Sequence, residues 1–458
     1  MRKISILRLG VVVLALARPA YADAPAGPVP QPAPVPVPAE GPPPPEDWSA
    51  HFQLTVVGDG YPGFPSAIPN GPNSLPSHGE VRETISGTAF LGRRLPWEGG
   101  ELYFNPEFNQ GFGLDRTFGI DGFPNGEAQK AGYDTPDPNV ARLFLRQTFG
   151  LGGEQETFEP DLNQLGETVD VSRITVTIGK FAAPDIFDGN QYAHDPRNDF
   201  LNWSIWESGA WDYPADVKGY TGGLAVELNE KDWALRGGWF LEPTISNQRD
   251  LDIRFWKHFG SVVELETRHQ WWGEPGVLRY LVFANRAHMG NLQQAVDIAE
   301  ATDTPADIVA VRADRWKVGF ALNLEQSLTE DLGFFSRLSW NDGHTEAWAF
   351  TDIDQSLAVG LSLKGASWGR AKDTIGLAGV VNGLSREHQL FFANGGTGIL
   401  AGDGSLDYAP EGIIETYYAF SVIDLAVLTF DYQFVANPAF NQARGPVHVI
   451  SARAHVQF

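Results

Sequence analysis

Apolar and polar residues alternate along most of the chain after Trp48. Residues 450–457 show the pattern best, because every second residue from Ile450 onward is apolar and the residues between are polar. The same alternation recurs within 143–149, 174–178, 224–235, 316–325, 357–364 and 428–434. Successive side chains of a strand point to opposite faces, so this pattern predicts β-strands with one apolar and one polar face. Helical spacing is clearest from Leu292 to Ala301, a short segment expected within a loop.

Strands of this kind fit a soluble β-sandwich or an outer-membrane β-barrel, and three features favour the barrel. Aromatic residues gather at the expected strand ends, as an interfacial girdle requires: Trp48, Phe52, Trp239, Phe240, Trp271, Trp272, Tyr417 and Tyr418. Short turns alternate with long loops, which are expected at 61–78, 114–139, 181–218, 285–315 and 392–412. The last strand ends on Phe458, with no tail expected after it.

Residues 48–458 provide enough chain for a wide barrel. Membrane strands of about 10 residues, with connections averaging about 15, give roughly 16 strands. The sequence therefore predicts an all-β protein, a transmembrane antiparallel β-barrel with long extracellular loops and short periplasmic turns. A barrel of this size leaves a water-filled channel, whereas an eight-stranded barrel is filled by its own side chains.

Two segments before the barrel are expected to lie outside its fold. Residues 1–22 have a positive start, an apolar run from Leu9 to Ala17 and a small-x-small site at Ala20-Tyr21-Ala22, which indicates a cleaved signal peptide. The run is too short to span a bilayer. Residues 23–47 form a proline-rich linker, since eleven of the 24 residues from Ala24 to Asp47 are proline. Such a segment favours extended polyproline II and is expected to be a disordered spacer.

Composition narrows the function further. The chain has 57 acidic and 33 basic residues and no cysteine among 458 residues. A formal charge of −24 argues against a nucleic-acid partner, and the absence of cysteine excludes thiol catalysis and cysteine-based metal sites. The sequence also lacks a Gly-x-Ser-x-Gly elbow, a His-Glu-x-x-His zinc helix and a phosphate-binding Gly-Lys-Ser/Thr loop. We therefore expect no enzyme activity, no metal and no cofactor.

The C-terminal segment Asp431-Tyr432-Gln433-Phe434-Val435-Ala436-Asn437-Pro438, followed by Asn441 and Arg444-Gly445-Pro446 and closing on Phe458, resembles the carbohydrate-selective outer-membrane porins of the OprB family. Three further stretches look similar: Gly179 to Asp188, Asn190 to Pro214, and Ala141 to Gln147. The resemblance runs from about residue 48 to the end. It implies a sixteen-stranded barrel of the outer membrane of a Gram-negative bacterium, which admits sugars passively through a constriction formed by infolded loops.

Two groups of residues are candidates for sugar selectivity. Aromatic rings with adjacent polar groups could stack on sugar rings, and the long loop offers Trp203, Trp206, Trp211 and Tyr213 together with Arg197. The alternative is that these aromatics pack the loop onto the barrel wall. Charged residues on expected lumen faces could set a transverse field, and these are Arg142, Arg146, Arg173, Glu101 and Glu107. The alternative for them is ion pairs that keep the lumen wet.

Phe458 is a candidate assembly signal, because the resemblance implies that barrel assembly machinery recognises a terminal aromatic residue. The other expected partners are mono- and oligosaccharides as permeants and outer-membrane lipid and lipopolysaccharide, with a homotrimer as an open assembly state. Three other functions stay open at this point: a general, non-selective diffusion porin, an outer-membrane barrel enzyme, and a secreted soluble β-protein that acts on glycans.

Overall fold

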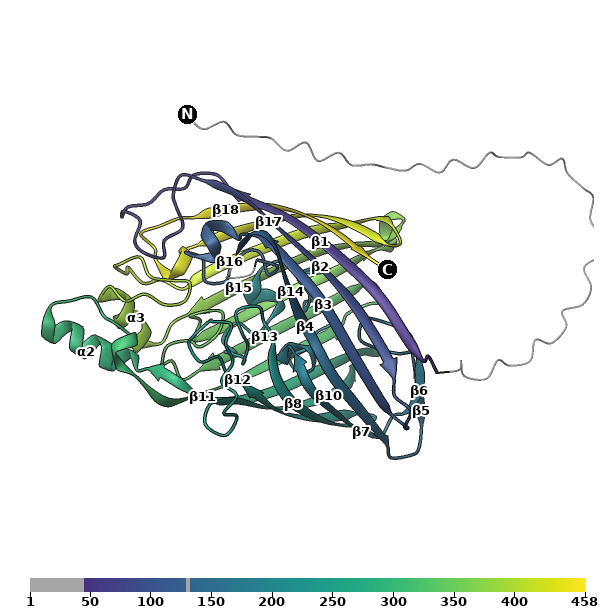
Figure 1. Ribbon diagram of the computed structural model, residues 1–458. Helices are drawn as coiled ribbons and strands as arrows, with labels where there is room; N and C mark the ends of the chain where they lie inside the picture. The colour runs from purple at the N-terminus through teal and green to yellow at the C-terminus, as the bar shows by residue number, and fades with distance from the viewer. Residues whose placement is uncertain (1–44, 129–131) are drawn as a thin grey trace, which may run out of the picture. The chain divides into compact units, whose positions relative to one another are not determined.

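The computed structural model describes residues 45–128 and 132–458, in which sixteen antiparallel strands close into a barrel (Figure 1). The order around the ring is β1-β18-β17-β16-β15-β14-β13-β12-β11-β10-β9-β8-β7-β4-β3-β2. The strands are β1 (Trp48–Tyr61), β2 (Glu80–Arg94), β3 (Gly100–Gly111), β4 (Tyr133–Gly150), β7 (Arg173–Phe181), β8 (Thr221–Asn229), β9 (Trp233–Leu241), β10 (Phe259–Trp271), β11 (Glu274–Gly290), β12 (Arg312–Ser327), β13 (Leu332–Asn341), β14 (Gln355–Gly365), β15 (Arg370–Gly383), β16 (Glu411–Ile423), β17 (Ala426–Ala436) and β18 (Val447–Gln457).

The predicted fold class is confirmed, and the barrel closes where its first and last strands pair. Register pairs run from Gln53↔Gln457 to Gly60↔Ile450 across this seam. Since every barrel strand has a neighbour on both sides, the ring leaves no open edge for another chain to pair with. None of the helices within the described residues has the length and apolarity needed to cross a bilayer.

The outer surface of the barrel is apolar, as the alternation predicts. On β14, Leu357, Val359 and Leu361 are between 38% and 49% exposed, whereas Ser356 and Ala358, which alternate with them along the strand, are buried. An exposed apolar stripe of this kind is stable against lipid chains, while the polar face lines the lumen.

The predicted aromatic girdle is wrong for two of its residues. Trp48, Trp239, Trp271 and Trp272 are exposed, but Phe240 and Tyr417 point inward and are buried. Glycine makes room for them, because a Cβ at Gly223 would lie 2.2 Å from the Phe240 ring, and one at Gly376 would lie 2.1 Å from the Tyr417 ring. The inward rings therefore pack over glycines of neighbouring strands, a contact that the sequence of one strand does not reveal.

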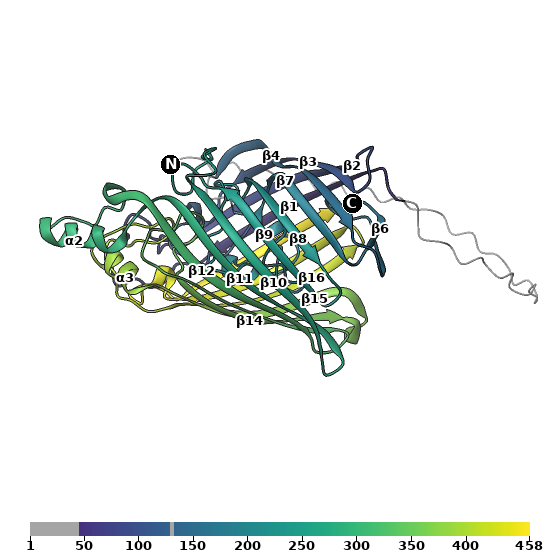
Figure 2. The same cartoon turned by 90° about the horizontal axis from the view of Figure 1, so that it is seen from below.

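The two ends of the barrel differ as predicted. Short turns join the strands at one end, at 95–99, 230–232, 272–273, 328–331, 366–369 and 424–425. Longer connections at the other end carry α1 (Trp203–Trp206), α2 (Leu292–Thr302), α3 (Arg386–Ala393), η1 (Leu114–Thr117), η2 (Ala183–Asp185), η3 (Val309–Val311) and η5 (Pro438–Phe440), while η4 (Ala366–Trp368) forms a short turn. Figure 2 shows α2 and α3 at the end away from β6.

The loop boundaries depart from the predicted ones. Two expected loops, 114–139 and 285–315, are shorter because β4 begins at Tyr133, β11 extends to Gly290 and β12 begins at Arg312. Backbone pairing continues there although the side chains no longer alternate cleanly, so a pattern of hydrophobicity ends before the strand does. Loops at 242–258, 342–354 and 437–446 were not predicted. The short-turn end also has one long connection, residues 151–172, which folds into the two-stranded sheet of β5 (Gln155–Phe158) and β6 (Glu167–Asp170).

The loop between β7 and β8, residues 182–220, lies inside the barrel. Arg337 on β13 donates to the Ile205 carbonyl (2.9 Å) and forms an ion pair with Asp188 (3.3 Å). Glu415 on β16 accepts from the backbone N–H groups of Leu201 (2.5 Å) and Asn202 (3.0 Å). These strands lie on the side of the ring opposite β7 and β8, so buried polar groups hold the loop across the lumen.

Candidate permeation site

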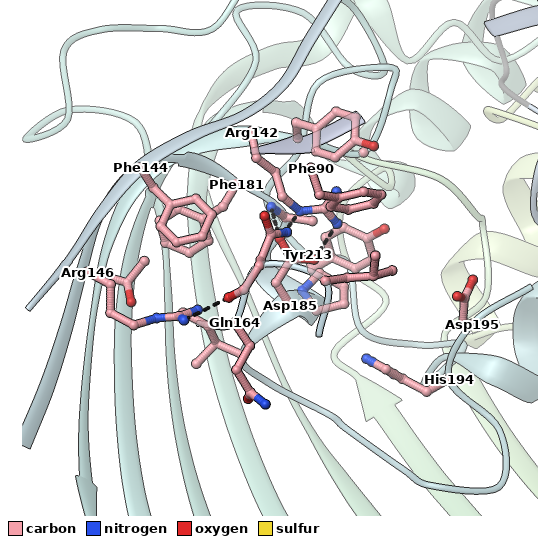
Figure 3. A pocket seen from close by; sticks show the side chains of 18 of the residues that line it. Phe90, Arg142, Phe144, Arg146, Gln164, Phe181, Asp185, His194, Asp195 and Tyr213 are labelled. Atoms are coloured by element: carbon pink, nitrogen blue, oxygen red, sulfur yellow. Dashed lines mark hydrogen bonds and ion pairs between the residues drawn. The ribbon is translucent and has the colours of Figure 1, made fainter. Parts of the chain in front are cut away.

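A cavity of about 700 Å³ lies inside the barrel between the infolded loop and the wall around β4 (Figure 3). This volume is within the range of about 300–1,000 Å³ that is usual for small-molecule sites. Eight of the ten predicted site residues line the cavity: Glu101, Arg142, Arg146, Arg173, Arg197, Trp203, Trp206 and Tyr213. Glu107 and Trp211 are not among its lining residues. The sequence therefore placed most of the candidates in one part of the lumen.

Arg142 and Asp185 form the closest charge pair of the cavity. Arg142 projects from β4, and its Nε and Nη2 atoms donate to Oδ2 and Oδ1 of Asp185, at 2.7 and 2.5 Å (Figure 3). The backbone N–H of Ala182 also donates to Asp185 (2.9 Å), and the Arg142 guanidinium lies over the ring of Tyr220 at 5.2 Å. A bidentate pair fixes both groups in one plane. Sequence reasoning did not select Asp185, although it lies in a family-like stretch.

Arg197 comes from the infolded loop and faces two carboxylates. Its Nε lies 3.0 Å from Glu127 and its Nη2 lies 3.8 Å from Glu107. Burial raises the pKa of the Glu127 carboxyl, and the charge of Arg197 acts against this shift. Glu107 accepts hydrogen bonds from the hydroxyls of Tyr220 and Thr88, both at 2.9 Å. These bonds hold the Glu107 carboxylate in place, and the fixed carboxylate helps to orient Arg197. The sequence did not indicate Glu127, because the folding of its loop, and not its spacing from Arg197 along the chain, brings the two residues together.

Arg146 and Arg173 continue the basic wall toward the short-turn end. Arg146 lies 3.7 Å from Glu101 and 5.0 Å from the centre of the Tyr103 ring. Arg173 forms an ion pair with Glu156 on β5 at 2.5 Å. The predicted lumen-facing charges are therefore paired, and each pair joins two different elements.

The charges that line the cavity nearly balance. Seven lining residues are basic and six are acidic, and these are Arg142, Arg146, Arg173, Arg197, Lys218, Arg236 and Arg268 against Glu101, Glu127, Glu167, Asp185, Asp195 and Glu227. Burial lowers the pKa of His194, so this lining residue adds no positive charge at neutral pH. The lining therefore does not carry the strong negative charge of the whole chain.

The aromatic residues of the loop form a packed cluster. Trp203 stacks with Phe123 and with Phe350, whose ring centres are 5.0 and 4.6 Å away. Trp206 meets Trp203 edge-on at 4.9 Å, and Tyr213 lies 4.4 Å from Phe350. These stacked neighbours and an exposure of only 4% leave little of the Trp203 ring for a sugar. The geometry therefore fits the alternative of loop packing, and the stacking role stays a prediction. Buried aromatic pairs of this kind stabilise a loop beyond their simple burial.

Comparison with known proteins gives the family. Residues 89–458 match the carbohydrate-selective porin family, OprB. The chain belongs to this family. Among solved structures, OprB of Pseudomonas putida is similar, with 15% identity, a TM-score of 0.66, and coverage of 90% of this chain and 94% of that one. The outer-membrane channel DcaP of Acinetobacter baumannii is 8% identical, with a TM-score of 0.48 and coverage of 90% and 98%. No curated protein sequence matches the chain significantly.

As a member of the OprB family, the protein is a carbohydrate-selective porin of the outer membrane. The family prediction and the predicted function are confirmed, and sugars are its permeants. The members of this family are channels. The alternatives of an outer-membrane enzyme and of a secreted glycan-active protein do not fit this family.

Proposed function

We propose that the cavity is the sugar-selective constriction of this OprB porin, with the pairs Arg142–Asp185 and Arg197–Glu127 as its polar contacts. One observation carries the proposal: two charge pairs, each contributed by different elements, line the same cavity beside the infolded loop. Guanidinium groups donate and carboxylates accept, so each pair can exchange hydrogen bonds with neighbouring hydroxyls of a sugar.

Charge balance supports a neutral permeant. A lining with seven basic and six acidic groups holds no strong excess of either sign, so it favours neither anions nor cations over an uncharged sugar. The pairs are held in place before the sugar arrives, which reduces the ordering cost of binding. Binding must also stay weak enough for release, and groups that can return to each other after the sugar leaves meet this requirement.

The aromatic cluster has a different proposed role. Trp203, Trp206 and Tyr213 line the cavity, but their rings pack against each other and against Phe123 and Phe350. We assign them to holding the loop at the height of the charge pairs. Trp211 packs 5.3 Å from Tyr213 and belongs to the same support.

Planar-bilayer recording tests the proposal. The purified porin is titrated with glucose and with short maltodextrins on either side of the membrane, and gluconate serves as the charged control. We expect stepwise channels that neutral sugars block saturably and that gluconate blocks less. Channels whose current falls only in proportion to solution viscosity would contradict sugar binding in this cavity and would favour simple size selection.

Export and assembly complete the proposed function. Residues 1–22 serve as the cleaved signal and residues 23–47 as the linker, and nearly all of both segments lies outside the described residues. Phe458 is the proposed contact for the barrel assembly machinery. Its N–H donates to the Phe52 carbonyl (3.0 Å), while the residue as a whole is 60% exposed and therefore open to a partner. Outer-membrane lipid and lipopolysaccharide are the surroundings expected for the apolar wall, and a homotrimer is a further assembly to test.

A further inference from the structure

The connection between β4 and β7 is unlike the other turns at its end of the barrel. The other six connections there have two to five residues, whereas this one spans residues 151–172 and contains the β5–β6 hairpin. Turns in barrels are short at the periplasmic end, and an ordered connection of this length usually has a function. The seven residues of this hairpin that line the central cavity are Phe158, Leu162, Asn163, Gln164, Leu165, Glu167 and Val169.

The tip of the hairpin reaches into the barrel. Leu165 is 1% exposed and packs in the same cluster as Tyr103 and Phe144, and its N–H donates to the Tyr103 hydroxyl (3.2 Å). The Asn163 carboxamide oxygen accepts from Asn105 (2.8 Å). Asn105 is the register partner of Arg142, and it stands five residues along β3, or roughly 17 Å, from the strand start at Gly100. The tip also contacts Arg146, four residues further along β4, so it lies beside β3 and β4 on the short-turn side of the Arg142–Asp185 pair.

The hairpin is held firmly in this position. Glu46 exchanges two hydrogen bonds with Gly166: its N–H donates to the Gly166 carbonyl, and its carboxylate accepts from the Gly166 N–H, both at 2.8 Å. Arg94 on β2 pairs with Glu167 (2.7 Å). At the tip itself, Asp161 and Gln164 exchange backbone hydrogen bonds of 3.1 Å around Asn163, whose φ is +53°. Groups on this tip are thus preorganised rather than free to swing.

The tip offers the chemistry that the arginines lack. The Asn163 carbonyl accepts from Arg146 Nη1 (2.9 Å), so hairpin and basic wall are in direct contact; Figure 3 shows Gln164 in the same region as Arg146. The Gln164 side-chain nitrogen donates to the Glu159 carbonyl (2.7 Å), and among the described residues its carboxamide oxygen accepts no hydrogen bond. A guanidinium group supplies only donors, whereas a carboxamide oxygen accepts from a sugar hydroxyl.

We propose that the β5–β6 hairpin forms the periplasmic half of the sugar site, with the carboxamides of Asn163 and Gln164 contacting the permeant after it passes the Arg142–Asp185 pair. The proposal rests on the proposed function of the cavity. It makes the constriction two-sided, with the loop 182–220 entering from the extracellular end and the hairpin from the periplasmic end. The ligand class is a neutral polyhydroxylated sugar.

The test compares the double variant Asn163→Gly/Gln164→Ala with Gln155→Ala, measuring block by glucose and maltotriose in planar bilayers. Glycine keeps the left-handed backbone at 163, and Gln155 is an exposed glutamine of the same hairpin that does not line the cavity. We expect the double variant to bind sugar about three- to tenfold more weakly, because it loses hydrogen bonds, while Gln155→Ala matches the wild type. If sugar blocks the wild-type channel and the double variant binds it with unchanged affinity, the hairpin proposal alone is overturned. A wild type that sugar does not block would overturn the proposed function itself.

A second variant covers the case in which the double variant does not assemble. Gln164→Glu keeps the size of the side chain and places a negative charge beside Arg146. If Gln164 faces the permeation path, the reversal potential in a salt gradient shifts toward cation selectivity. A reversal potential equal to that of the wild type and of Gln155→Glu would overturn the proposal.

Discussion

Arg142 on β4 and Asp185 in the β7–β8 loop bind each other through two parallel hydrogen bonds of 2.7 and 2.5 Å. One partner belongs to the rigid wall and the other to the infolded loop. The pair therefore joins the loop to the wall, and it also presents donors and acceptors at the edge of the cavity.

Replacement of Arg142 should separate charge from geometry. We expect Arg142→Ala to weaken sugar block by roughly tenfold, because a charge-assisted contact is worth about 1.5–3 kcal/mol, and to shift ion selectivity toward cations. Arg142→Lys keeps the charge but not the two-pronged geometry, so its selectivity should stay near the wild type while its sugar block weakens. Conductance titrations and reversal potentials measure both effects. Equal sugar block in all three proteins would count against a role for this arginine.

The packing role of Trp203 leads to a different expectation. Because Trp203 is buried and stacks with Phe123 and Phe350, Trp203→Ala removes support from the loop and leaves a cavity, a change that typically costs about 3–5 kcal/mol. We expect larger conductance and more gating noise, with Trp203→Phe close to the wild type. Trp256→Ala, at an exposed loop position, is the control. A quiet channel of normal conductance in Trp203→Ala, with sugar block lost, would instead favour direct stacking on the sugar.

The buried carboxyl of Asp199 should make the stability difference between the wild type and Asp199→Asn depend on pH. Burial, reinforced by the charge of Asp195, raises the pKa of this loop carboxyl from 3.8 to about 6. The folded state therefore holds the proton more tightly than the unfolded state, and this contribution to stability is complete below pH 4 and is lost as the pH rises through 6. Asp199→Asn cannot ionise, but its carbonyl can still accept from the backbone N–H groups of His194 and Asp195.

Thermal unfolding in detergent tests this expectation. The asparagine variant should melt close to the wild type at pH 4 and above it at pH 7.5, with the difference developing between pH 4 and 6. Asp303→Asn, at an exposed position with φ of +54°, should show no such trend. A difference that is constant with pH would contradict a buried, titrating Asp199.

Phe458 should affect assembly rather than transport. We expect Phe458→Ser to lower the amount of heat-resistant barrel in the outer membrane several-fold, because its exposed ring is the proposed contact for the assembly machinery. Barrels that do assemble should conduct and bind sugar normally, since Phe458 lies outside the cavity. Phe430→Ser, at an exposed aromatic of β17, controls for loss of lipid-facing surface. Equal yields of the two variants would remove the special role of the last residue.

The strands could be predicted because their cause is local. A strand between lipid and water needs an apolar residue at every second position, and that rule is visible within ten residues. Phe240 and Tyr417 escape the rule because they pack inward over Gly223 and Gly376, which belong to neighbouring strands. The direction of these side chains depends on the register between strands, and the hydrophobic pattern within one strand does not contain that information.

The candidate site was predictable on its wall and less so in its loops. Alternation on β3 and β4 predicts that Arg142, Arg146 and Glu101 face the lumen, because the face of the strand decides whether a side chain meets water or lipid. Asp185, Glu127 and the hairpin tip reach the cavity only through long-range folding of their loops. The same is true of the stacked contacts of Trp203, since Phe123 and Phe350 lie far from it in sequence.

The seam between β1 and β18 has a consequence for how the protein folds. Thr55 and His455 are hydrogen-bonded across it at 2.9 Å, although 400 positions separate them in the chain. The remaining strand pairs are each joined by a single connection, so an open sheet can grow hairpin by hairpin before the seam forms. Contacts between distant segments form slowly because the chain must first be brought together. We therefore expect closure of this one seam to limit the folding rate, and the unclosed sheet, with its two bare edges, to be the species most exposed to aggregation.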